Sequence, residues 1–372
     1  LPAEDLPAPR IAEGGTLVEA PFASGEDVEG AAVLEFTGDE ESAGMLYASI
    51  LGQGGNDASS GVAVDRERNA YVTGRSYRPT SLAAPGPFQI SSGGSFEAFV
   101  LKMSGDGSAM VYASFLGGRD LDSGVAIAVD GQGSATVAGT TRSPDLPGTA
   151  GHFRPTHAGG DDAFALKLGP AGTEIVYATY LGGAADDRAA DLALDGAGSA
   201  YVAGTTSSPD FPLTQGAWDI HLDGPDAFVV KLDPTGNGLA YATLVGGGSW
   251  EQGQGVAVDG AGQAVLVGTT ASADLPTTPG ALRSALAGET DAFIARLNAA
   301  GTALAYATYL GGSSGESAHS VALDAAGSAY VSGDTGSADF PVTDGSFGMA
   351  HGGEQDAFLA KIDTAGALSY AG

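Results

Sequence analysis

The chain of 372 residues contains no cysteine. Disulfide bonds, thiolate nucleophiles and cysteine-ligated zinc are therefore excluded, although this absence does not decide the redox compartment. Basic residues are also scarce, with 15 Lys and Arg against 45 Asp and Glu, and the formal net charge is −30. A field of this sign repels polyanions and attracts cations or basic partners. We therefore expect no nucleic-acid partner.

Long apolar runs are lacking as well. No stretch approaches the roughly 18 to 20 apolar residues that a helix needs to cross a bilayer, so we expect no membrane span. The chain starts at Leu1 without an initiator Met or a basic segment followed by an apolar one. We interpret it as a mature chain that has lost its signal peptide. It stops at Gly372 inside a motif that other copies continue, which is compatible with a fragment of a longer precursor.

Turn-forming residues are abundant, with 60 Gly and 18 Pro between short apolar runs. This composition is typical of many short strands. Whole blocks of sequence return every 64 or 65 residues, marked by Tyr47, Tyr112, Tyr177, Tyr241, Tyr306 and Tyr370. Such a period indicates a repeat architecture. A residue present in every copy should serve that architecture, so we look for chemistry where copies differ.

Each repeat contains four strand-like segments, which we term a, b, c and d. In one copy they cover residues 189–195, 200–205, 226–232 and 239–245. Short Gly-rich turns join a to b and c to d, as in hairpins, and a long loop joins b to c. Four antiparallel strands per repeat predict one blade of a β-propeller. We therefore predict an all-β fold, a single β-propeller of four-stranded antiparallel blades.

Counting copies gives five full blades and, before them, strands c and d at residues 31–36 and 46–51. Residues 10–13 and 16–20 have a strand, turn, strand layout that can supply a and b, which makes six blades. The chain thus divides into a divergent acidic segment, residues 1–29, and the repeats, residues 30–372. If residues 1–29 do not fold back, they become an exchanged strand, because strand c then keeps an open edge that can pair with another chain.

Four motifs recur in fixed order and phase, and they resemble the bacterial SBBP beta-propeller repeats. They are Gly-Val-Ala-Val-Asp at 61–65 and 255–259, Asp-Phe-Pro at 210–212 and 339–341, Asp-Ala-Phe at 226–228 and 356–358, and Tyr-Ala-Thr-Tyr-Leu-Gly-Gly at 177–183 and 306–312. The resemblance covers about residues 30–372. It implies a secreted or cell-surface bacterial protein with no established catalytic role. The family name refers to seven blades, which is the alternative to six.

One aspartate closes strand a in every copy, and a glycine follows three residues later in four of them. We interpret this pair as a turn, in which the carboxylate accepts backbone N–H groups and the glycine adopts a positive φ. Metal binding is the alternative. The aspartates are Asp65, Asp130, Asp195, Asp259 and Asp324, and the glycines are Gly133, Gly198, Gly262 and Gly327.

The long b–c loops and the d–a links should emerge on one face of the ring, and loops on rigid scaffolds often carry binding function. The d–a links are acidic in every blade. Calcium prefers carboxylate and carbonyl oxygens, so we consider Ca²⁺ as a cofactor, with solvated acidic loops as the alternative. The candidate cation-binding residues are Asp57, Asp120, Asp122, Asp186, Asp187, Glu251 and Glu316. Trp218 and Trp250 are candidate ligand-binding residues, because an aromatic face can stack on a sugar.

Enzyme motifs are weak in this sequence. The five histidines do not form a helical His-x-x-x-His frame, and no phosphate-binding Gly-x-x-x-x-Gly-Lys loop occurs. We therefore expect a non-catalytic structural or adhesive module that associates with itself, as a polymer or filament, or with other surface proteins and glycans. A glycan-binding lectin is the alternative. A hydrolase would require acids that converge at the mouth of the ring.

Overall fold

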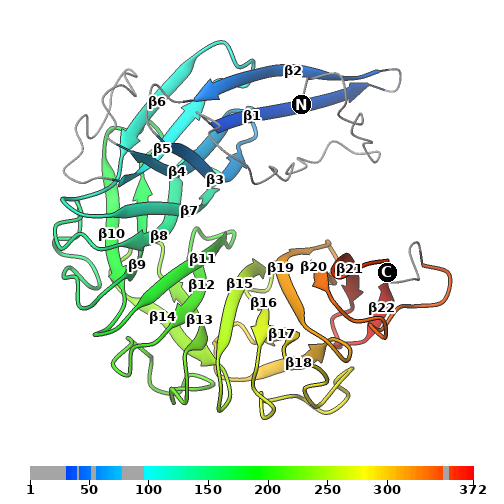
Figure 1. Ribbon diagram of the computed structural model, residues 1–372. Coiled ribbons are helices and arrows are strands. Elements are labelled where there is room, and N and C mark those ends of the chain that lie inside the picture. Colours follow the sequence, from blue (N-terminus) through cyan, green and yellow to red (C-terminus); the bar gives the residue numbers. More distant parts are fainter. Residues whose placement is uncertain (1–30, 40–41, 52–55, 78–95, 347–351) are drawn as a thin grey trace.

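In the computed structural model, the residues that the structure describes are 31–39, 42–51, 56–77, 96–346 and 352–372. They form five four-stranded antiparallel sheets and one two-stranded sheet. The expected strands at 10–13 and 16–20 lie outside the described residues. Figure 1 shows the sheets following one another along an arc, with β1 and β2 at one end and β19 to β22 at the other.

The sheets follow chain order. The two-stranded sheet contains β1 (Ala31–Asp39) and β2 (Ser42–Leu51). The first two four-stranded sheets contain β3 (Asp57–Val64), β4 (Ala70–Tyr77), β5 (Phe96–Met103) and β6 (Met110–Phe115), then β7 (Asp122–Val129), β8 (Ala135–Thr141), β9 (Asp162–Leu168) and β10 (Ile175–Leu181). The third contains β11 (Asp187–Leu194), β12 (Ala200–Thr206), β13 (Asp226–Leu232) and β14 (Leu239–Val245). The last two contain β15 (Glu251–Val258), β16 (Ala264–Thr270), β17 (Asp291–Leu297) and β18 (Leu304–Leu310), then β19 (Glu316–Leu323), β20 (Ala329–Thr335), β21 (Asp356–Ile362) and β22 (Leu368–Ala371).

Strands β3, β7, β11, β15 and β19 are the a strands and lie innermost in the arc (Figure 1). Residues from all five of them line a central hollow of about 240 Å³. Each a strand carries a register shift at the same point, for example between Ala189 and Asp191 in β11. A bulge of this kind bends the strand and increases its twist, which suits the crowded centre of the array.

The core lies between the sheets and inside them. The strand c phenylalanines Phe164, Phe228 and Phe293 are fully buried. Phe228 pairs with Gly204 on the neighbouring strand, and a Cβ added to Gly204 would lie 2.8 Å from the Phe228 ring. The glycine of strand b and the phenylalanine of strand c therefore recur together, because the ring occupies the space that a side chain on strand b would need.

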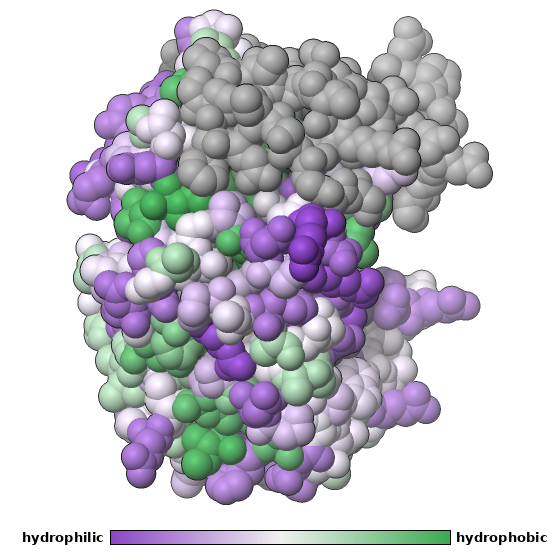
Figure 2. Space-filling model, turned by 90° about the vertical axis from the view of Figure 1, so that its left-hand side faces the viewer, coloured by the Kyte–Doolittle hydropathy of each residue, from purple (hydrophilic) through white to green (hydrophobic). Residues whose placement is uncertain are grey.

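The outer side of the molecule shows separate hydrophobic patches between hydrophilic residues (Figure 2). No helix within the described ranges has the length and apolarity that a membrane crossing requires.

The predicted all-β architecture of four-stranded antiparallel sheets is confirmed, and it is propeller-like. The described strands make five complete blades and one half-blade, because β1 and β2 correspond to strands c and d alone. A complete sixth blade, and the seven-bladed alternative, stay predictions.

Candidate functional site

The first acid of strand a is built into the loop face of each junction between sheets. Asp122 is 1% exposed and accepts hydrogen bonds from the Gly118 N–H at 2.8 Å and the Ser143 hydroxyl at 2.8 Å. The Thr141 hydroxyl also donates to it. Equivalent glycine N–H groups donate to Asp187, Glu251 and Glu316. These acids hold the Gly-Gly link between one sheet and the next.

A second acid, on the b–c loop, binds the same link from the other side. The Ala184 N–H donates to Asp210 at 2.7 Å, and the Ser313 N–H donates to Asp339 at 2.7 Å. Asp145 and Asp274 accept equivalent bonds. The aspartate of the Asp-Phe-Pro motif therefore joins its loop to the d–a link.

A third acid was missed in the sequence. It is the first acid of strand c, on the preceding sheet, and it recurs buried as Glu97, Asp162, Asp226 and Asp291. At one junction a Cβ added to Gly311 would lie 2.6 Å from Asp291 Oδ1 and 2.5 Å from Glu316 Oε2. Carboxyl groups of successive sheets thus meet at the first glycine of the Leu-Gly-Gly motif. The sequence signal that could have identified this acid is its recurrence directly before Ala-Phe in each repeat.

Burial decides the ionisation of these groups. It raises the pKa of Asp122, Asp187 and Asp291. It also raises the pKa of Asp226, to about 7, with the charge of Glu251 as the second cause. Each of these acids therefore holds its proton to a higher pH than an exposed carboxyl group does.

The seven candidate cation-binding residues do not form one metal centre. Four of them are the buried link-holding acids described above. The Ser76 hydroxyl donates to Asp57, Asp120 accepts from the Leu121 N–H at 2.9 Å, and Asp186 pairs with Arg188 at 3.1 Å. No group of three or more His, Asp or Glu placed for a metal ion occurs among the residues described. The period puts one such acid at each junction, where backbone N–H and hydroxyl groups donate to it, so cation binding at the separate links stays a prediction.

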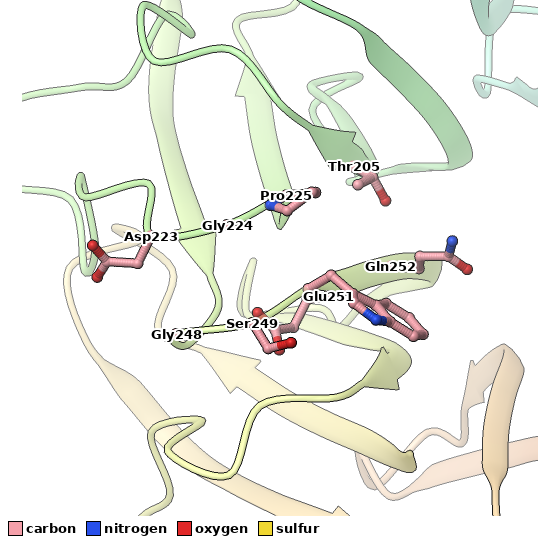
Figure 3. Close-up of a pocket in the computed structure, with 9 residues that line it drawn as sticks. Thr205, Asp223, Gly224, Pro225, Gly248, Ser249, Glu251 and Gln252 are labelled. Carbon is pink, nitrogen blue, oxygen red and sulfur yellow. The ribbon is translucent and has the colours of Figure 1, made fainter. Parts of the chain in front are cut away.

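The two candidate tryptophans are separated. Trp250 lines a hollow of about 470 Å³, together with Thr205, Asp223, Gly224, Pro225, Gly248, Ser249, Glu251 and Gln252. Figure 3 shows Asp223 at the end of this hollow away from Gln252. Trp218 is not among the lining residues. Its backbone N–H donates to the Gly301 carbonyl at 2.8 Å, and the residue is half-exposed.

The aspartate that closes strand a forms the predicted turn. Asp130 accepts the N–H groups of Gln132 and Ser134, both at 2.9 Å, and Gly133 has a φ of 83°. Lys167, on strand c, lies 2.8 Å from Asp130. The turn prediction is confirmed, and a basic residue on strand c completes the pair in every complete blade.

The link between β18 and β19 spells Gly-Gly-Ser-Ser-Gly at 311–315, the letters of a nucleophile elbow. Its central Ser313 donates both its N–H and its hydroxyl to Asp339, at 2.7 and 2.9 Å. The serine is thus held in the link by Asp339, and within the described ranges no histidine forms a hydrogen bond with it.

Three stretches of the chain match the family model of the SBBP beta-propeller repeat, residues 46–78, 176–212 and 305–341. The chain carries these repeats, as its motifs indicated. No curated protein sequence matches it significantly.

Among solved structures, the chain is similar to BamB from Moraxella catarrhalis, at 10% identity and a TM-score of 0.32 over 92% of this chain and 94% of that one. A protein of unknown function from Dyadobacter fermentans shares 12% identity, with a TM-score of 0.42 over 86% of this chain and 79% of that one. A mutant of the Synechocystis apocarotenoid oxygenase shares 10% identity, with a TM-score of 0.42 over 92% of this chain and 68% of that one.

Proposed function

We propose that this chain is a non-catalytic, secreted or cell-surface propeller module with a structural or adhesive role, and that copies of it associate end to end. The repeats support a structural, non-catalytic role, because their recurrent acids accept hydrogen bonds from the links between successive sheets. The implied surface location comes from the SBBP resemblance. One observation carries the self-association, the uncovered face of the C-terminal sheet.

That face is apolar at a position which every preceding complete sheet buries. Leu359 on β21 is 44% exposed, whereas its equivalents Val100, Ala165, Val229 and Ile294 are fully buried. Val229, for example, packs with Val256 and Leu266 of the following sheet. Leu359 therefore exposes, beside the polar Ser332 on the neighbouring strand, a position that the preceding complete sheets bury.

The other end of the array supplies a complementary feature. Within the described part of the chain, β1 pairs with β2 alone, so its second edge can accept a strand. An uncovered face at one end and an incomplete sheet at the other favour a head-to-tail contact between copies. Such contacts build a filament unless the copies close into a ring. Because each copy carries a charge of −30, divalent cations such as Ca²⁺ would ease the approach of copies.

Sedimentation velocity over a range of concentrations tests this proposal. We expect oligomers whose proportion increases with concentration. We expect Leu359→Asp to weaken association about tenfold to a hundredfold, because burial of the leucine side chain in the contact would contribute about 1.5 to 3 kcal/mol of binding free energy. Val176→Asp is the matched control, since Val176 is 40% exposed on a d strand away from this face. A chain that stays monomeric at every concentration, with and without calcium, would contradict the proposal.

A glycan-binding lectin is the second candidate, favoured by the hollow that Trp250 shares with Gln252, Thr205 and Ser249. Aromatic, amide and hydroxyl groups are the chemistry that holds a small polar ligand. We expect Trp250→Ala to abolish any binding on a glycan array. Trp218→Ala is the control, because Trp218 does not line the hollow; equal loss in both variants, or no binding by the wild type, would remove this function.

A further inference from the structure

The junction between sheet β11–β14 and sheet β15–β18 holds two buried acids in one place. Asp226 begins β13 and is 1% exposed, and Glu251 begins β15 and is 0% exposed. They meet at the Gly-Gly link: a Cβ on Gly246 would overlap the Asp226 carboxyl group, and the Gly247 N–H donates to Glu251 Oε2 at 2.8 Å. The two carboxyl groups therefore border the same pair of glycines.

The two acids differ in their hydrogen bonds. Glu251 is supplied with donors at both oxygens, because the Thr270 hydroxyl donates to Oε1 at 2.6 Å and Gly247 donates to Oε2. Asp226 Oδ1 is buried without a hydrogen-bond partner among the described residues. A charged oxygen in that position would lose its hydration and gain nothing in return. Glu251 is therefore the better place for the negative charge.

The charged groups that face Asp226 are acidic on every packed element. They are Glu251 on β15, and Asp219 and Asp223 on the loop that leads into β13. Beyond Glu251, Asp274 of the next loop accepts the Gly248 N–H, and Tyr309 donates its hydroxyl to the Ser272 carbonyl. On the same loop His221 lies 3.4 Å from Asp219, but no lysine, arginine or histidine forms an ion pair with Asp226 or Glu251 within the described residues.

Two other junctions carry a basic side chain. His157 lies 3.9 Å from Asp162, and the charge of Arg154 opposes the rise that burial causes in the pKa of that acid. The charge of Arg283 opposes the rise in the pKa of Asp291 in the same way. The Asp226 junction is therefore a place where the repeats differ in chemistry while sharing one backbone.

We propose that the Asp226–Glu251 junction is a proton-binding site, in which Asp226 carries one proton beside the charged Glu251, and that release of this proton weakens the contact between the two sheets. Loss of the proton to solvent breaks the Asp226 O–H bond and leaves two facing carboxylates. Their repulsion acts directly between β13 and β15. The raised pKa of Asp226, about 7, agrees with this geometry and puts the release close to neutral pH.

The sign of the effect follows from linkage. An unfolded aspartate has a pKa of about 3.9, so between about pH 4 and pH 7 the folded chain holds a proton that the unfolded chain has lost. Stability therefore falls as pH rises across this window, and the equilibrium constant for unfolding increases about tenfold per pH unit. Above about pH 7 the contribution levels off.

Urea unfolding of the full chain from pH 5 to pH 9, in a buffer with EDTA, tests the site. Asp226→Asn keeps the shape and the donor of the protonated acid, so we expect it to remove this pH dependence and to unfold less readily than wild type at pH 8. Asp356→Asn is the matched control, because Asp356 begins strand c of the last sheet. Its profile should run parallel to that of the wild type.

Two results would overturn the proposal. One is an Asp226→Asn profile parallel to that of wild type. The other is a metal site, shown if calcium restores stability to the EDTA-treated wild type and Asp226→Asn is destabilised at every pH. Should the variant fail to fold, infrared spectroscopy of the wild type decides: we expect the carbonyl band of a protonated carboxylic acid at pH 5 to fade by pH 8, and its absence at pH 5 would contradict the site.

Discussion

At the scale of single residues, the recurrent glycines and acids explain one another. The first glycine of Leu-Gly-Gly leaves room for two carboxyl groups from successive sheets, and the second donates its N–H to one of them. The two glycines of the motif therefore have different roles. Some glycine positions leave no room for a side chain, whereas others would accept one.

Gly311 belongs to the first kind. We expect Gly311→Ala to lower the free energy of unfolding by about 1 to 3 kcal/mol, because overpacking costs this much and the new Cβ would meet Asp291 and Glu316. Gly260→Ala is the control, since nothing lies within 4 Å of a Cβ there. Urea denaturation measures both, and equal effects would contradict the assignment.

Arg68 breaks the turn rule in the first complete blade. It occupies the position of Gly133 and has a φ of 66°, a conformation that costs an L-residue roughly 1 to 2 kcal/mol. We predict that Arg68→Gly raises the melting temperature, with a gain of about 1 kcal/mol. Arg66→Gly, in the same turn but without positive φ, should give no gain; a gain of similar size there would point to loss of charge instead.

At the scale of elements, the a–b hairpin could be predicted and the junction could not. The turn at Asp130 depends on residues four positions apart, so the sequence carries the whole pattern. The meeting of Asp226 with Glu251 depends on how one sheet packs on the next, and no local spacing reports that. The same limit applies to the candidate cation-binding acids: they recur along the chain, but the structure puts them at different junctions.

The Asp130 turn makes a testable element. Burial alone would raise the pKa of Asp130, but Lys167 and the N–H groups of Ser134 and Gln132 outweigh it and lower the pKa. Its stabilisation is therefore present above about pH 3.9, the unfolded value, and is lost as pH falls through the folded pKa. We expect Asp130→Asn to cost about 1 to 3 kcal/mol at pH 7, and the difference from wild type to shrink in acid. Urea denaturation measures both chains; a difference in stability that stays constant from pH 7 into acid would contradict this role of Asp130.

At the scale of the whole molecule, five similar sheets and a half-sheet produce an array whose two ends differ. The inner junctions bury their apolar faces, while the last sheet leaves Leu359 exposed. In the proposed assembly, a second copy would cover this apolar position as the following sheet covers it at the inner junctions. The proposed role as an assembling module follows from this contrast between interior and end.

Electron microscopy of the negatively stained full chain, with and without millimolar calcium, tests that claim most directly. We expect propeller-shaped particles joined end to end, and separate particles of the same shape for Leu359→Asp. Wild-type particles that remain separate at every concentration would contradict it.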